Sequence, residues 1–349
     1  MKNLLLAVIT TSLITACANT ELATQKIDNA AMKQAAQTNI TPTQAVENAY
    51  LALDKANKNE LTFYTPLHFN GVQKSFDKIT LLQQQNSVSQ DSSKDKLIIT
   101  EAFKAQKLID EASQVKSNIE HLLFDSLNHK EVLDQLDSKK AFPKKYKNIN
   151  NDLVDLFKLI EQNRSDKALK NQVDLIEDMT ELEIDTLVDT YVKPAIFILD
   201  KAEDFDADDY AEKTFNLAEL SIEHAENFIA ENPRNIAGVK EAGEDAILAA
   251  KRALNIGQFS KSLVELDEER AEIKALEMED LLSAIIDGFN ANGLEGLTLD
   301  EQSQELARLA RIQTSKLKQQ SLLINNHTAE STVNGTEAVP AEINTNIVN

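Results

Sequence analysis

The sequence carries one signature twice: LDKANKNELTFYTPLHFNGVQKS at residues 53–75 and LDKAEDFDADDYAEKTFNLAELS at residues 199–221. The two stretches agree at 8 of 23 positions without a gap, whereas chance gives roughly one or two agreements. The shared alanines suit close helix crossings, the tyrosines precede a helix, and the phenylalanines begin an apolar stripe. We therefore predict structural roles for the residues that define the repeat: Ala56, Tyr64, Phe69 and Asn70 in the first copy, and Ala202, Tyr210, Phe215 and Asn216 in the second.

Helix signals continue on both sides of the two copies. Capping boxes stand at Thr41–Gln44 and Thr298–Glu301, and apolar residues recur at helix spacing from about residue 94 to 128. The chain has only 8 glycines and 6 prolines, and no segment shows a convincing strand alternation. The sequence therefore predicts an all-α protein, an elongated helical bundle of two tandem duplicated helix-hairpin units.

This pattern divides the chain into five predicted segments. They are a signal peptide at 1–16, an acylated cysteine and flexible tether at 17–40, a first helical unit at 41–165, a second helical unit at 166–318, and a disordered tail at 319–349.

The N-terminal segment predicts export and lipidation. A short apolar run, Leu4–Ile14, follows Lys2, and it is too short for a permanent membrane span. The next residues, Ile14-Thr15-Ala16-Cys17, resemble the lipobox of bacterial lipoproteins. This resemblance implies cleavage after Ala16 and acylation, palmitate included, at Cys17, which is the single cysteine of the chain. The alternative is an ordinary secretory signal with an incidental cysteine.

A second resemblance concerns the helical region itself. Tyr64-Thr65-Pro66-Leu67, opening a helix after an Ala/Lys-rich one, is similar to the uncharacterised helical region of proteobacterial envelope lipoproteins. Some of those relatives carry it ahead of an OmpA-like domain, which we do not expect here. The second copy departs from the motif, with Glu212 in place of Pro66. Because Ala18 follows the cysteine, the resemblance implies an outer-membrane anchor with the protein facing the periplasm.

Charge and composition exclude several kinds of site. The formal net charge of −21 argues against nucleic-acid binding, and we expect no metal, no cofactor and no enzymatic activity. The acidic cluster Asp204–Glu212 lacks the glycine and glutamate of a calcium loop, so we interpret it as favourable charge at a helix N-terminus. We expect each histidine to be a partly exposed helix residue and not a ligand: His68, His121, His129, His224 and His327.

A lysine-rich connector interrupts the acidic background. It is a possible contact for an anionic surface, and the alternative is a solvated linker. Its basic residues are Lys139, Lys140, Lys144, Lys145 and Lys147.

Three functions are compatible with these features. The first is a structural or scaffold role in the cell envelope, with a protein partner of unknown identity. The second is a carrier or assembly chaperone that binds an apolar ligand or peptide between helical units. The third is an unrecognised hydrolase.

Overall fold

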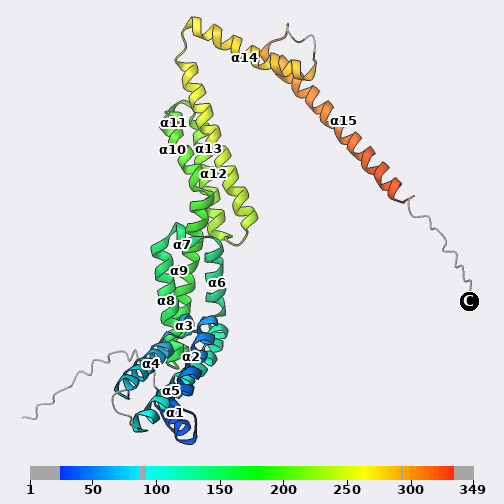
Figure 1. Ribbon diagram of the computed structural model, residues 1–349. Coiled ribbons are helices and arrows are strands. Elements are labelled where there is room, and N and C mark those ends of the chain that lie inside the picture. Colours follow the sequence, from blue (N-terminus) through cyan, green and yellow to red (C-terminus); the bar gives the residue numbers. More distant parts are fainter. Residues whose placement is uncertain (1–23, 87–91, 292–293, 295, 334–349) are drawn as a thin grey trace, which may run out of the picture. The chain divides into compact units, whose positions relative to one another are not determined.

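The protein is described by a computed structural model (Figure 1), which covers residues 24–86, 92–291, 294 and 296–333. These residues form helices and no strand, so the predicted all-α class is confirmed. The chain divides into two compact units at Gly257/Gln258, inside the predicted second helical unit. Each compact unit is described by itself below.

The helices of the described residues follow one another with short connections. They are α1 Gln25–Gln37, α2 Pro42–Lys58, α3 Leu61–Tyr64, α4 Pro66–Asn86, α5 Ser92–Leu122, α6 Phe124–Gln135, α7 Ser138–Ala141, α8 Pro143–Glu161, α9 Ser165–Tyr191, α10 Lys193–Glu203, α11 Ala207–Tyr210, α12 Glu212–Glu231, α13 Ile236–Val264, α14 Glu268–Phe289 and α15 Leu299–Val333.

Three hydrophobic clusters follow one another along the first compact unit, which runs from blue α1 to yellow α13 in Figure 1. The first cluster draws on α1, α2, α4 and α5, the second mainly on α5, α6, α8 and α9, and the third mainly on α9, α10, α12 and α13. The long helices link them, because α5 contributes Ala112 to the first and Ile119 to the second, and α9 contributes Leu182 to the second and Leu187 to the third.

Four non-glycine residues in the described part of this unit have a left-handed φ, namely Asn163 before α9 and three residues that each begin the same kind of turn. Glu60, Asp137 and Asp206 have φ of 56°, 61° and 58°, and each is followed by a helix of only four residues: α3, α7 and α11. A long helix begins two residues after each short one ends. Left-handed φ is unfavourable for residues other than glycine, and aspartate tolerates it better than most. The recurrence of this conformation therefore marks three equivalent turns.

The middle turn belongs to a segment of similar local form, which residue matching alone does not detect. From Glu60 to Asp137 is 77 residues and from Asp137 to Asp206 is 69, so the outer turns stand 146 apart, which is the spacing of the sequence signature. Burial recurs at the same offsets. The matching buried positions are Ala56, Leu133 and Ala202 before the turn, Leu61, Ser138 and Ala207 within it, and Phe76, Leu153 and Ile222 after it. The predicted division into two tandem duplicated units is therefore not confirmed. A middle segment has the same local form as the two segments that carry the sequence signature.

The long helices α5, α9 and α13 also correspond. Their equivalent buried positions are Ile98, Ala168 and Val239, then Ala105, Leu175 and Ala246, then Ala112, Leu182 and Ala253. For their similar local form alone, we call the three segments the first copy (α2–α5), the second copy (α6–α9) and the third copy (α10–α13).

Helices α9 and α13 each contact the short helix of the same copy, α7 and α11, at an equivalent position. In the second copy, Thr186 Oγ1 lies 3.0 Å from Ser138 Oγ at the start of α7. In the third copy the equivalent residue is Gly257, where a Cβ would lie 2.3 Å from Ala207 Cβ and 2.8 Å from its Cα. Only glycine allows this approach of α13 to α11.

We expect Gly257→Ala to destabilise the protein by about 1–3 kcal/mol, because the added methyl must displace the backbone of α11. The measurement is the urea midpoint followed by circular dichroism at 222 nm. Gly71→Ala is the matched control, because its Cβ would meet only the flexible end of Leu108 at 3.1 Å, and higher helix propensity offsets that contact. Equal midpoints for the two variants would contradict the close crossing.

The second compact unit is thinly packed. Its cluster contains three buried residues, Ile286, Leu294 and Leu306, from the end of α14, the following loop and α15. Thr298 begins α15 as predicted, because the Thr298 amide donates to Glu301 at 2.9 Å and the Glu301 amide donates back to Thr298 at 3.3 Å. The predicted capping box at Thr41 and Gln44 is also present.

Two predicted segments differ from the structure. The expected tether contains helix α1, which buries Ile27 and Ala31 in the first cluster. The expected disordered tail is helical as far as Val333, because α15 continues past residue 319. Both segments are polar, and the weak apolar periodicity of each concealed the helix.

Candidate functional site

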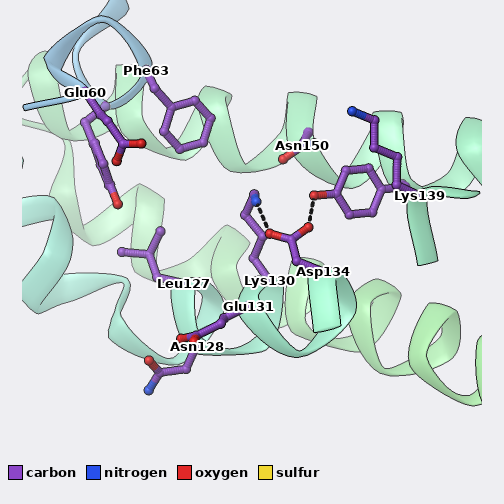
Figure 2. Close-up of a pocket in the computed structure, with 11 residues that line it drawn as sticks. Glu60, Phe63, Leu127, Asn128, Lys130, Glu131, Asp134, Lys139 and Asn150 are labelled. Atoms are coloured by element: carbon purple, nitrogen blue, oxygen red, sulfur yellow. Dashed lines mark hydrogen bonds and ion pairs between the residues drawn. The ribbon is translucent and has the colours of Figure 1, made fainter. Parts of the chain in front are cut away.

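A pocket of about 570 Å³ lies where the first copy meets the second (Figure 2). Residues from α3 and the turn before it form one side, and residues from α6, α7 and α8 form the rest. The lining residues are Glu60, Phe63, Tyr64, Leu127, Asn128, Lys130, Glu131, Asp134, Lys139, Tyr146 and Asn150.

The turn at Glu60 supplies the aromatic side of the pocket. Phe63 and Tyr64 lie edge to face with ring centroids 5.2 Å apart, and both contact Phe157 of α8, at 5.3 and 5.4 Å. Lys116 Nζ stands 4.6 Å from the centre of the Tyr64 ring. Burial, followed by the nearby charges of Glu120 and Glu60, raises the pKa of Tyr64. The hydroxyl of Tyr64 is therefore neutral at physiological pH, where it can donate a hydrogen bond.

A charged triad occupies the middle of the pocket. Asp134 accepts hydrogen bonds from Lys130 Nζ at 2.6 Å and from the Tyr146 hydroxyl (Figure 2). Burial opposes charge on both Asp134 and Lys130, but their mutual hydrogen bond and the contacts with Tyr146 outweigh it. The pKa of Asp134 is therefore lowered and that of Lys130 raised. The triad satisfies its own charges and offers little to a ligand.

Other polar groups of the pocket remain available. Neither Glu60 nor Glu131 is ion-paired within the described chain, although Glu131 accepts a hydrogen bond from Gln135 Nε2 at 3.3 Å, and Asn150 Oδ1 is buried without a hydrogen-bond partner there. Figure 2 places Glu60 with Phe63 on one side and Glu131 on the opposite side. Carboxylates beside aromatic rings attract cationic groups such as lysine ammonium and arginine guanidinium. These groups of the pocket therefore suit a positively charged, hydrogen-bond-donating group.

A buried polar pair holds the first copy against the second. Glu161, at the end of α8, accepts hydrogen bonds from the amides of Leu67 and His68 at 3.0 and 2.9 Å. Its Oε1 also lies 2.7 Å from His68 Nδ1, and both side chains are almost fully buried. The carboxylate thus caps the N-terminus of α4, where helix amides lack partners within the helix.

A related contact holds the second copy. His129 Nε2 of α6 lies 2.8 Å from Glu183 Oε2 of α9, and Arg234, after α12, approaches the same oxygen at 2.9 Å. His68 and His129 are both buried, so the prediction of partly exposed histidines is wrong for them. Helix periodicity could not predict that these histidines are buried, because their partners Glu161 and Glu183 lie far away in the sequence.

The five lysines that were predicted to contact an anionic surface do not all have the same surroundings. All five of its lysines are exposed, on α7 and the first turns of α8. Lys139 lines the pocket, whereas Lys145 binds Glu181 of α9 at 2.7 Å and also pairs with Asp185. The hydrogen bonds that Lys145 donates to Asp185 and Glu181 raise its pKa. Lys145 is thereby committed to joining α8 to α9, and the others stay open to solvent.

The repeat-defining residues take several positions. Ala56, Ala202 and Phe215 are buried, Tyr64, Tyr210 and Phe69 are partly buried, and Asn70 and Asn216 are exposed on the outer faces of α4 and α12. Tyr64 is the only one of them that lines the pocket. The predicted lipidation residue, Cys17, lies outside the described residues.

No protein-family model, curated protein or solved structure matches this chain. None of the described helices is long and apolar enough to cross a membrane. Within the same residues, no cluster of three or more histidine, cysteine or acidic side chains is arranged to hold a metal ion. Function is therefore inferred from the chemistry of the chain.

Proposed function

We propose that this protein is a lipid-anchored scaffold of the bacterial cell envelope that holds a basic segment of a partner protein. The observation that carries the proposal is the pocket between the first and second copies, which is lined by the ring of Phe63 and by the carboxylates of Glu60 and Glu131, neither of which has a salt bridge in the described chain. Tandem helical repeats present extended surfaces of this kind to protein partners. The lipobox-like residues at 14–17 support a location at the outer membrane.

The lining favours this scaffold over the carrier alternative. An apolar ligand needs a predominantly hydrophobic cavity, whereas five of the eleven lining residues carry charge. A lysine or arginine side chain finds an aromatic ring and carboxylates among the residues that line this pocket. The overall charge of −21 also favours encounter with basic partners.

We expect Glu60→Gln/Glu131→Gln to weaken binding of a fluorescein-labelled octa-arginine peptide at least fivefold, because both pocket carboxylates lose their charge. The measurement is fluorescence anisotropy in about 0.1 M salt, where distant charges are largely screened. The matched control is Glu268→Gln/Glu269→Gln, which changes the net charge equally on α14. Equal weakening in both variants would mean that only the overall charge attracts the peptide, and it would contradict binding at the pocket.

The same site can be tested in cells. A photo-crosslinking amino acid at Asn128, which lines the pocket, should capture one defined envelope protein. At Leu217, which is exposed on α12, it should not. Capture that persists in the Glu60→Gln/Glu131→Gln background would count against recognition by these carboxylates.

A further inference from the structure

The second compact unit leaves most of its apolar surface uncovered. On α14, five large apolar side chains are exposed: Ile273, Leu276, Met278, Leu281 and Ile285. On α15, Ile312, Leu317 and Leu322 are exposed as well. The cluster between the helices contains only Ile286, Leu294 and Leu306 as buried residues. The free energy gained by burying three such side chains is small beside the entropy lost in ordering two long helices.

The charge of α14 is opposite to that of residues 306–322 in the middle of α15, although α15 as a whole carries four acidic and four basic residues. Helix α14 carries seven acidic residues and two basic ones, a net charge of −5. Residues 306–322 of α15 carry Arg308, Arg311, Lys316 and Lys318 and no acidic residue. Both basic residues of α14 pair with neighbouring carboxylates, Arg270 with Asp267 and Lys274 with Glu277. The remaining acidic charge of α14 therefore has no counterpart on its own helix.

Within the described part of one chain, α14 and α15 pack together only along the last two turns of α14. Phe289 lines a groove of about 370 Å³ with Leu309, Ile312 and Leu317 of α15, and the hydrophobic cluster reaches back along α14 to Leu282. Lys274 stands over the ring of Phe259, but the exposed apolar residues of 271–281 join no hydrophobic cluster of the described chain, and the side chains of Arg311, Lys316 and Lys318 form no ion pair there.

We propose that this unit is a self-association element, in which α14 of one copy of the chain packs on residues 306–322 of a second copy, and reciprocally. Both halves of such an interface are present on one chain, which is what a two-fold, self-complementary contact requires. Pairing places the acidic helix α14 on the basic residues 306–322 twice and covers exposed apolar side chains of both. An anionic membrane surface is a poorer occupant, because it repels a helix of net charge −5.

Two charge-reversal variants test the reciprocal contact. Variant A is Arg311→Glu/Lys316→Glu/Lys318→Glu, and variant B is Glu272→Lys/Glu279→Lys/Asp280→Lys, each in the full chain with Cys17→Ser. We expect the parent to sediment as a dimer, and A or B alone to raise the dimer dissociation constant at least tenfold, because like charges then face each other. An equimolar mixture of A and B should form a heterodimer, since both of its contacts again join opposite charges.

Two further measurements distinguish this contact from a general effect of net charge. Lys139→Glu/Lys140→Glu/Lys144→Glu alters the net charge as variant A does but lies in the first unit, so it should leave the dimer intact. Differently tagged chains carrying Leu281→Cys or Leu317→Cys should form a disulfide between chains when mixed. A monomeric parent at 50 μM, no A–B heterodimer, or recruitment of the parent to phosphatidylglycerol vesicles through α14 would each overturn the proposal.

Discussion

Replacing Glu161 with alanine should destabilise the protein by about 3–5 kcal/mol, the effect expected when one partner of a buried polar pair is removed. The variant leaves the amides of Leu67 and His68 without their acceptor and His68 Nδ1 without its carboxylate neighbour. A buried donor without a partner costs far more than the net value of the bond it made. The measurement is the urea midpoint, together with amide hydrogen exchange in the first turn of α4.

The matched control is Glu181→Ala on α9. Glu181 is exposed and pairs with Lys145, which keeps a second carboxylate at Asp185, so the change should stay within about 0.5 kcal/mol. Glu161→Gln should fall between the two, because the amide oxygen still accepts one hydrogen bond. Unaltered exchange at Leu67 and His68 in Glu161→Ala would show that the carboxylate is not the cap of α4.

Replacing Cys17 with serine should abolish both palmitate incorporation and membrane association, because serine lacks the thiol that accepts the lipid. The residues that motivate this expectation are Ile14–Cys17, which resemble a lipobox. The described helices offer no membrane span to compensate, and two or more acyl chains are needed for stable anchoring. Metabolic labelling with palmitate and fractionation of membranes from soluble extract measure the two effects.

A conservative change beside the cysteine provides the control. Ala16→Gly keeps a small residue before the cleaved bond and should leave labelling unchanged. Parent protein that carries no palmitate would contradict the anchor without affecting the helical fold. Cys17→Ser protein that remains in the membrane fraction would point to an attachment other than lipid.

Helix starts with local signals could be predicted well. The capping boxes at Thr41 and Thr298 require residues only three apart, so their hydrogen bonds follow from short stretches of sequence. Pro194 stands in the first turn of α10, where its missing amide hydrogen removes no hydrogen bond of the helix. Helix α1 and the end of α15 were missed, because polar sequence with a weak apolar stripe also describes linkers.

The middle copy shows where sequence comparison fails. At its equivalents of Leu53, Phe69 and Asn70 stand Lys130, Tyr146 and Lys147, and its spacing to the first copy differs from that to the third. Conformation persisted where identity did not, because a left-handed residue and small or apolar buried side chains are enough to form the turn. Burial tolerates any apolar side chain of suitable volume, which hides the copy from residue matching.

The sequence singled out two residues of the candidate pocket, but it did not predict the pocket itself. Tyr64 was singled out as part of the repeat, and Lys139 as part of the lysine-rich connector, yet the two line one cavity. No local pattern connects residues so far apart in the chain. Glu60, Glu131 and Asn150, whose polar groups favour a cationic ligand, carried no sequence signal, because isolated polar residues on helices are usually exposed.

The sequence by itself determined the all-α class, the main helix caps and the acidic charge, since these depend on composition and on residues within one helical turn. The lipid anchor at Cys17 stays a prediction of the same local kind. Only the tertiary structure decided that His68 meets Glu161, that His129 meets Glu183, and that three turns of one conformation follow one another. The physical reason is range: hydrogen bonding within a helix is local, whereas burial of a polar pair depends on which distant helix packs against it.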